Sequence, residues 1–248
     1  MNLQFKKWIS NGDSYYREND AIDDYTIRGI LGEGRYGIVY LAVDGENKEY
    51  VVKQFKKEMI KKSGSKLFYE TKILKKLHHP CFPKYIANFN DGTREGYIME
   101  YMKGKVFEDI LQKDRHQFQR EEIYEICTQL LDMVEILHGY NIVHRDIRIP
   151  NVIRKDEKEL SLIDFGLARI MKPDYYTRES DYWYIGDFLI HLYYSTYQKV
   201  GRIDKPWFKE LDLNREEEVL LKRLMGIKET YKSITQIRQQ LDRIKETM

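Results

Sequence analysis

Three glycines lie close together between two runs of residues with strand character. The stretch reads Leu31-Gly32-Glu33-Gly34-Arg35-Tyr36-Gly37-Ile38-Val39. A glycine-rich turn lets the backbone come close to a bound phosphate and offer it amide donors. The spacing G-x-G-x-x-G also opens dinucleotide-binding folds, but there it leads into a helix, whereas residues 38–43 are strand-like. The pattern favours a phosphate-binding hairpin, and an ordinary glycine-rich hairpin is the alternative.

A lysine follows on the next predicted strand, in Val51-Val52-Lys53. Because its stem is flanked by valines, its ammonium can point inward at a phosphate rather than out to water. Most lysines are only surface charges. Glu70 lies on the following predicted helix, however, and its carboxylate can hold the ammonium in a partly desolvated ion pair. The two residues together predict an inward-pointing cation.

Two later stretches carry further acidic and amide side chains. They are IVHRDIRIPNVI at residues 142–153 and LSLIDFGLA at residues 160–168. The first contains H-R-D with an asparagine five residues after its aspartate, and the second contains D-F-G. With the glycine loop, the strand lysine and the helix glutamate, these motifs stand in one order from about Tyr25 to Gly186. The sequence therefore resembles the protein kinase superfamily, as a small form of the eukaryotic-type serine/threonine kinases.

The resemblance implies a fold and a role for each motif residue. The fold is α+β and two-lobed, with an antiparallel β-sheet and one helix in the amino-terminal lobe and a shortened, mainly helical carboxyl-terminal lobe. Asp146 would accept or orient the proton of the attacking hydroxyl. Asn151 and Asp164 would hold Mg²⁺, which prefers hard oxygen ligands. Lys53, paired with Glu70, would contact the α- and β-phosphates of ATP.

The resemblance also implies the residues around the nucleotide. Arg148 stands where serine/threonine kinases usually carry lysine and some tyrosine kinases carry arginine, and either cation can stabilise charge on the transferred phosphoryl group. Met99 corresponds to the residue at the back of the pocket, and residues 100–102 to the hinge that pairs with adenine. The expected nucleotide-binding residues are Leu31, Gly32, Gly34, Gly37, Val39, Val51, Lys53, Met99, Glu100, Met102 and Ile153.

The chain departs from the family pattern after D-F-G. Only residues 167–180 separate that motif from Asp181-Tyr182-Trp183-Tyr184-Ile185-Gly186, and the Ala-Pro-Glu element is absent. The stretch GIKETYKSITQI, which begins at Gly226, has no arginine before Ser233. Both members of the family's buried glutamate–arginine pair are therefore missing. Losing one partner would strand a buried charge, whereas losing both can be nearly neutral. We expect a coherent small architecture that lacks most of the substrate shelf.

Two features of the shortened loop bear on the site. The resemblance implies that Asp181 hydrogen-bonds the backbone of the H-R-D loop and anchors Asp146; the alternative is that Asp181 caps its helix and Asp187 is the deeper acid. Arg145 could pair with a phosphate and order the loop, although solvent-facing hydroxyls are common in loops. The loop hydroxyls are those of Tyr175, Tyr176, Thr177 and Ser180.

Hydrophobic periodicity predicts the elements that position the motifs. Strands are expected within residues 25–55 and at 85–90 and 96–101. Helices are expected from Lys66 to the His-His-Pro at 78–80, along an apolar stripe at 123–137, across 188–197, and from Ser233, with Gln236 completing a capping box. The predicted parts are an extension at residues 1–24, an amino-terminal lobe at 25–101, and a hinge with the carboxyl-terminal lobe at 102–248. The extension has few apolar residues, so we expect it to be loosely held.

Bulk properties bound the class of protein. The chain has 248 residues, 42% hydrophobic and 33% charged, with a formal net charge of +2. Such a charge is too small to make nucleic acid or a membrane the main partner. No apolar run approaches the roughly 20 residues that cross a bilayer, and two cysteines give no disulfide framework. We therefore expect a cytoplasmic protein. The lysine-rich stretch at 53–76 indicates a solvated helix face, with an acidic partner as the alternative.

The leading interpretation is an ATP-dependent, magnesium-requiring serine/threonine protein kinase whose partners are ATP and a protein substrate. A kinase-like transferase acting on a small molecule is the first alternative, since such relatives also lack the peptide shelf. A pseudokinase that binds nucleotide without turnover is the second alternative. It is disfavoured because Lys53, Asp146 and Asp164 are all retained.

Overall fold

The structure is a computed structural model that describes residues 12–63, 69–198 and 205–246. These residues form two compact units. The first comprises the described residues up to Lys75 together with Pro83–Tyr101, and the second comprises Lys76–Phe82 and the described residues from Met102 onward. The expected helix start at Lys66 lies outside the described residues.

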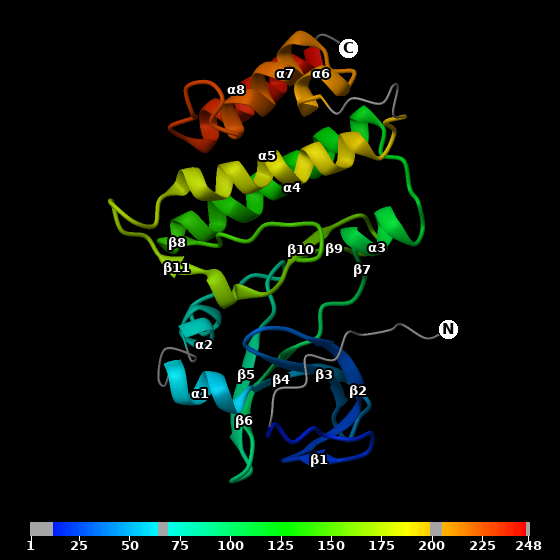
Figure 1. The fold of residues 1–248 in the computed structure, drawn as a ribbon, viewed down its shortest axis with the longest axis vertical. Coiled ribbons are helices and arrows are strands. Elements are labelled where there is room, and N and C mark those ends of the chain that lie inside the picture. Colours follow the sequence, from blue (N-terminus) through cyan, green and yellow to red (C-terminus); the bar gives the residue numbers. More distant parts are fainter. Residues whose placement is uncertain (1–11, 64–68, 199–204, 247–248) are drawn as a thin grey trace. The chain divides into compact units, whose positions relative to one another are not determined.

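A six-stranded antiparallel sheet forms most of the first unit (Figure 1). Its strand order is β1-β2-β3-β4-β6-β5. The strands are β1 (Ala21–Ile22), β2 (Tyr25–Glu33), β3 (Gly37–Val43), β4 (Glu49–Phe55), β5 (Tyr85–Asn90) and β6 (Glu95–Glu100). The strands predicted within residues 25–55 and at 85–90 and 96–101 are confirmed, with boundaries that differ by a few residues.

The register of the sheet decides which side chains share a face. Val39 on β3 lies opposite Lys53 on β4, and Val51 on β4 lies opposite Met99 on β6. Opposite residues on neighbouring strands share a face, as do residues two apart on one strand. Lys53 therefore lies on one face with three apolar side chains, while the intervening residue Val52 points to the other face.

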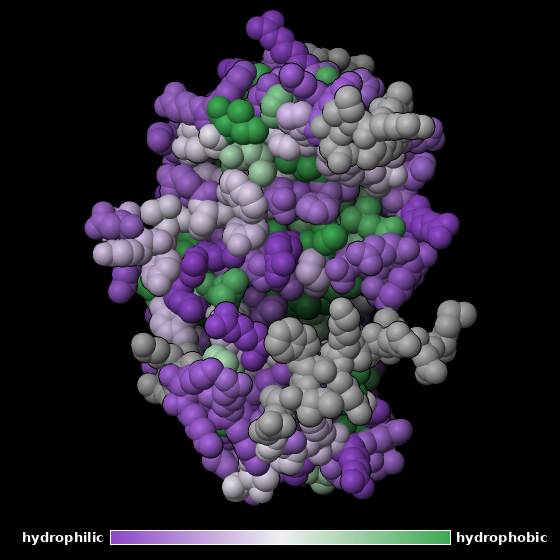
Figure 2. All heavy atoms as spheres, viewed as in Figure 1, coloured by the Kyte–Doolittle hydropathy of each residue, from purple (hydrophilic) through white to green (hydrophobic). Residues whose placement is uncertain are grey.

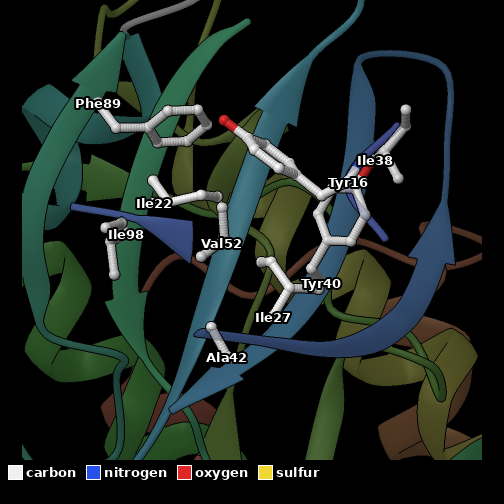
Figure 3. Close-up of a cluster of buried hydrophobic side chains, with 9 residues drawn as sticks. All are labelled: Tyr16, Ile22, Ile27, Ile38, Tyr40, Ala42, Val52, Phe89 and Ile98. Carbon is white, nitrogen blue, oxygen red and sulfur yellow. Dashed lines mark hydrogen bonds between the residues drawn. The ribbon is translucent and has the colours of Figure 1, made fainter. Parts of the chain in front are cut away.

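A hydrophobic cluster covers that other face (Figure 3). It contains Tyr16, Ile22, Ile27, Ile38, Tyr40, Ala42, Val52, Phe89 and Ile98. The ring of Tyr16 packs edge-on against Tyr40 at 5.6 Å and Phe89 at 6.1 Å between centroids. Its hydroxyl donates to Asp91 Oδ2 at 2.8 Å. The expectation of a loosely held extension is wrong for the segment around Tyr16, because this aromatic ring anchors it in the core.

Two short helices accompany the sheet. They are α1 (Lys57–Ser63) and α2 (Tyr69–Leu74), so the structure adds α1 to the one helix expected. Asp13 Oδ1 accepts the amide of Lys57 at 2.8 Å and thereby satisfies a donor at the start of α1. The lysines exposed on these two helices are Lys57, Lys61, Lys62 and Lys72, in agreement with a solvated face.

Helices dominate the second unit (Figure 1). They are α3 (Phe107–Gln112), α4 (Arg120–Gly139), α5 (Arg178–Tyr194), α6 (Trp207–Glu210), α7 (Arg215–Leu224) and α8 (Ile234–Glu246). The predicted stripe at 123–137 is the buried side of α4, which packs along α5. At the start of α8 Ser233 Oγ accepts the amide of Gln236 at 3.3 Å, which is one bond of the predicted capping box. Gln236 Oε1 accepts the amide of Lys232 at 2.9 Å instead of that of Ser233, so the reciprocal bond is shifted by one residue.

Short strands of the second unit hold the loops that carry the motifs. Strand β9 (Val152–Arg154) pairs with β10 (Leu160–Leu162) and with β7 (Lys105–Val106), while β8 (Ile142–Val143) pairs with β11 (Arg169–Ile170). A 3₁₀ turn at Phe165–Leu167 lies between β10 and β11. These pairings bring the H-R-D and D-F-G loops together. The strands are only two or three residues long, so hydrophobic periodicity in the sequence could not predict them.

A buried carboxylate joins three helices of the second unit. Glu217 on α7 is fully buried and accepts the hydroxyls of Tyr124 on α4 at 2.5 Å and Tyr193 on α5 at 3.0 Å. Arg120 Nε donates to the same oxygen at 3.0 Å. Each donor satisfies the buried charge. This buried acid thus ties α4, α5 and α7 together.

Hydrophilic side chains predominate on the viewed face of each unit (Figure 2). Among the described helices, none combines the length and the apolar character that a membrane crossing requires.

Candidate active site

The glycine loop is a tight hairpin between β2 and β3. The amide of Gly34 donates to the carbonyl of Gly37 at 2.9 Å and closes the turn. A Cβ atom on Gly37 would lie 2.3 Å from the carbonyl oxygen of Gln54, so only glycine fits there. Cβ atoms on Gly32 and Gly34 would have no neighbour within 4 Å among the described residues. The sheet therefore requires Gly37, whereas the other two glycines keep side chains off the tip of the hairpin.

Charged contacts anchor this hairpin to its own unit. Glu33 accepts Lys56 Nζ at 2.6 Å and the hydroxyl of Tyr15 at 3.3 Å. The amide of Lys56 donates to the carbonyl of Tyr36 at 3.2 Å. The loop is thus held at its base by an ion pair and by the backbone, and Leu31 beside it is exposed.

Lys53 and Glu70 form the ion pair that the sequence predicts. Lys53 Nζ lies 2.8 Å from Glu70 Oε2, and both side chains are buried. Strand β4 supplies the lysine and α2 supplies the glutamate. Burial makes the interaction strong but also costs desolvation, so each charge depends on the other. The pair stands on the sheet face that carries Val39, Val51 and Met99; its role toward phosphate stays a prediction.

In the second unit, the carboxylate of Asp146 is held from two sides. Asn151 Nδ2 donates to Asp146 Oδ2 at 2.8 Å and to the carbonyl of the same residue at 2.9 Å. Arg148 Nε lies 2.5 Å from Oδ1 and Nη2 lies 3.1 Å from Oδ2. This bidentate contact raises the pKa of Arg148. The arginine is therefore a fixed cation bound to Asp146, in a forked geometry that lysine could not reproduce.

Asn151 and Asp164 are brought together by the β9–β10 hairpin. The amide of Ile163 donates to the carbonyl of Asn151 at 2.9 Å, so the residue after Ile163 stands beside the asparagine. Asp164 has a left-handed backbone with φ of 60° and is exposed. A non-glycine residue in this region is uncommon and marks a constrained turn. Its carboxylate accepts the amide of Gly166 at 3.4 Å.

This donor set fits a magnesium ion that also binds phosphate. Asn151 uses its amide nitrogen on Asp146, which makes the amide oxygen the end that can bind a cation. With Asp164 it offers one amide oxygen and one carboxylate. Mg²⁺ commonly takes one or two protein ligands and completes its shell with water and phosphate. Among the described residues no group of three His, Cys, Asp or Glu side chains could hold a metal without such help.

Asp181 anchors the H-R-D loop, as predicted. It is fully buried on α5 and accepts the amides of Arg145 at 2.8 Å and His144 at 3.1 Å. Thr177 rather than Asp181 is the N-cap of α5, and Asp187 is only partly buried. Arg145 has a φ of 66°, so the loop turns sharply at the point that Asp181 holds. The alternative reading, with Asp187 as the deeper acid, is wrong.

Sequence reasoning missed a third partner of Asp181. His138 Nε2 lies 3.0 Å from Asp181 Oδ2, and the imidazole is buried near the end of α4. The signal that could have found it is its position four residues after Val134, on the apolar side of the helix. A histidine at such a buried position requires a polar partner.

The other expected nucleotide-binding residues are divided between the units. Met99 is buried on β6 and Glu100 ends that strand in the first unit. Met102 and Ile153 are buried in the second unit, where Ile153 pairs with Val106. Their contacts with a nucleotide stay a prediction.

Comparisons with known proteins agree with this geometry. A family model described as "Protein kinase domain" matches residues 25–201. The probable serine/threonine-protein kinase YbdM of Bacillus subtilis (strain 168) is 37% identical over 227 residues, which cover 88% of each chain. The serine/threonine-protein kinase PLK4 of Drosophila grimshawi is 30% identical over 160 residues, 62% of this chain and 21% of that protein. The SNF1-like protein kinase ssp2 of Schizosaccharomyces pombe is 32% identical over 162 residues, 64% of this chain and 28% of that protein. This chain belongs to the protein kinase family.

Proposed function

We propose that this protein kinase transfers the γ-phosphate of ATP to serine or threonine hydroxyls of a protein substrate. The observation that carries the proposal is the oriented carboxylate of Asp146, which Asn151 and Arg148 hold and which Asp181 anchors through the loop backbone. The Bacillus relative, which this chain matches over most of its length, is described as a probable serine/threonine-protein kinase. This description supports serine and threonine as acceptors.

Asp146 can receive a substrate hydroxyl in its present arrangement. A carboxylate has about four lone-pair positions. Three hydrogen bonds from Arg148 and Asn151 use three of these positions on the carboxylate of Asp146. The fourth position can accept the proton of a substrate hydroxyl. Because the carboxylate is already oriented, the substrate hydroxyl would meet this position without further ordering of the side chain. Such positioning is a main source of catalysis in phosphoryl transfer.

Arg148 would keep this carboxylate oriented. Its guanidinium binds both carboxylate oxygens in a forked contact. The same positive charge would lower the energy of negative charge that gathers on the transferred group. We therefore assign Arg148 to the transfer step rather than to nucleotide affinity.

Lys53 and Glu70 would serve the nucleotide. The contact with Glu70 Oε2 at 2.8 Å holds the ammonium in place. A buried lysine held by a carboxylate is a point charge suited to phosphate oxygens. Gly32 and Gly34 would let backbone amides approach the same phosphates, because these two residues carry no side chain of their own.

Asn151 and Asp164 would hold Mg²⁺ through one amide oxygen and one carboxylate. When bound, the metal would neutralise phosphate charge and orient the phosphoryl group. For the chain itself, the left-handed turn at Asp164 and the fixed amide of Asn151 would set the positions of these oxygens.

We also infer that the protein works in the cytoplasm. Cys81 and Cys127 are both buried and free. Free buried thiols are compatible with a reducing compartment, in which disulfides are rare.

The test is transfer of labelled phosphate with the purified chain, magnesium and ATP. The acceptors are a panel of proteins and a panel of sugars and aminoglycosides, followed by identification of the labelled amino acid. We expect label on serine and threonine of proteins. The control is Asp156→Asn, which changes an exposed carboxylate outside the motifs. Label only on small molecules, or only on tyrosine, would contradict the proposal.

A further inference from the structure

The segment between β11 and α5 is held by backbone pairing (Figure 1). Met171 donates its amide to the carbonyl of Asn141 at 2.8 Å, which continues the β8–β11 pairing. Lys172 and Tyr176 then exchange amide–carbonyl bonds of 3.1 and 3.0 Å, closing a turn. The segment is therefore ordered up to Tyr176 by hydrogen bonds that involve no phosphate.

Arg145 reaches this turn from the H-R-D loop. Its guanidinium carbon lies 4.8 Å from the ring centroid of Tyr176, within cation–π distance. Its Nη1 donates to the carbonyl of Leu167 at 3.2 Å. Its backbone amide is bound by Asp181, and the next residue along the chain is Asp146. One side chain thus links the turn to the loop that carries the proposed catalytic carboxylate.

The four loop hydroxyls differ in their surroundings. Tyr175 is 79% exposed. Ser180 Oγ donates to the carbonyl of Thr177 at 2.8 Å at the start of α5. Among these four residues, Tyr176 is the one whose ring lies against Arg145.

We propose that Tyr176 is a positioning residue for phosphoryl transfer. Its ring holds the guanidinium of Arg145 and thereby the loop that orients Asp146, so the loop after D-F-G needs no phosphate to be active. The inference rests on the proposed kinase function, because the contact matters only if Asp146 takes part in transfer. It gives an aromatic ring the ordering role that a phosphate paired with Arg145 would otherwise have.

The test compares four variants by initial-rate kinetics toward ATP and protein acceptor. Tyr176→Leu and Tyr176→Ala remove the ring, and we expect a roughly 3- to 30-fold lower kcat, the range that corresponds to a cation–π contact. The KM for ATP should stay unchanged. Tyr176→Phe keeps the ring and should restore kcat to within about twofold of the parent chain. Tyr175→Ala, at the exposed neighbour, is the matched control and should leave kcat unchanged.

Two further measurements test whether Tyr176 acts through Arg145 and whether the rate depends on phosphate. In an Arg145→Ala background the Tyr176→Leu change should have no additional effect on kcat, because the partner is gone. Parent protein treated with a phosphatase should reach its full rate without a lag. The inference is overturned if the parent chain is active and the kcat of Tyr176→Leu equals that of the parent chain. It is also overturned if the kcat of Tyr176→Phe is as low as that of Tyr176→Leu. A lag in the phosphatase-treated parent protein that preincubation with ATP removes would overturn it as well. An inactive parent chain would instead refute the proposed function.

Discussion

Replacing Asp181 with asparagine tests how the H-R-D loop is held. Its Oδ1 accepts the amide of Arg145, and its Oδ2 accepts the amide of His144 and Nε2 of His138. An asparagine side chain has one acceptor oxygen, so its amide group must face at least one of these donors. That donor is left buried and unsatisfied, which costs about 1–3 kcal/mol.

The remaining hydrogen bonds lose the assistance of a full negative charge, which weakens each by roughly 0.5–1 kcal/mol. The sum is about 2–5 kcal/mol of unfolding free energy. At about 3 °C per kcal/mol for a chain of this size, the Tm should fall by roughly 6–15 °C. Because the loop carries Asp146, kcat should also fall by about 10- to 100-fold.

The assay pairs thermal unfolding with initial rates measured well below the Tm of the variant. The matched control is Asp187→Asn on the same helix. Asp187 is partly exposed, and its Oδ2 lies 3.8 Å from Nδ1 of His191. This change should alter stability by less than about 0.5 kcal/mol. If Asp181→Asn matched Asp187→Asn in both Tm and kcat, the anchoring argument would be refuted.

Three further predictions concern the glycine loop, the metal and pH. Gly37→Ala should destabilise the chain by about 2–3 kcal/mol in chemical unfolding because its Cβ would meet a backbone carbonyl at 2.3 Å, whereas Gly34→Ala should leave stability unchanged and raise the KM for ATP several-fold. Asp164→Asn should abolish the magnesium dependence of ATP binding in calorimetry; unchanged dependence would remove Asp164 as a ligand. Burial raises the pKa of Asp91, but hydrogen bonds led by that of the Tyr16 hydroxyl outweigh it and lower the pKa from 3.8 to about 2. A carboxyl whose pKa is lowered in the folded state stabilises the fold at pH values above its pKa in the unfolded chain. The difference in unfolding free energy between the parent chain and Asp91→Asn should therefore stay constant from pH 7 to 5 and close as pH falls from about 4 to 2. A difference that persists at pH 2 would contradict this reasoning.

Long periodic or motif-bearing segments were predictable. The apolar stripe of α4 and the runs of β-branched and apolar residues in β3 and β4 are strong signals because tertiary packing follows them directly. The ion pair of Lys53 and Glu70 was predictable for a similar reason: an apolar flank leaves a lysine few other orientations. The bond from Asp181 to the loop backbone depended on the resemblance to a family, since spacing alone left Asp187 as a rival.

Features that depend on single side chains were not predictable. Tyr16 is one aromatic ring in a polar segment, so periodicity gives no sign that it anchors the core. Glu217 on α7 looks like one acid in a charged run, and only the fold brings Tyr124 and Tyr193 to it. The contact of Arg145 with Tyr176 likewise arises from a turn that backbone pairing closes. In each case, residues far apart in sequence meet through packing that no local pattern encodes.

The most direct test of the account is the activity of Asp146→Asn. The variant keeps a side chain of the same shape but loses the carboxylate that we propose accepts the substrate proton. We expect kcat for transfer to protein serine and threonine to fall roughly 10²- to 10⁴-fold, with ATP affinity in calorimetry nearly unchanged. Transfer at the rate of the parent chain, or an equal loss of ATP affinity, would contradict the assignment of Asp146 to the acceptor.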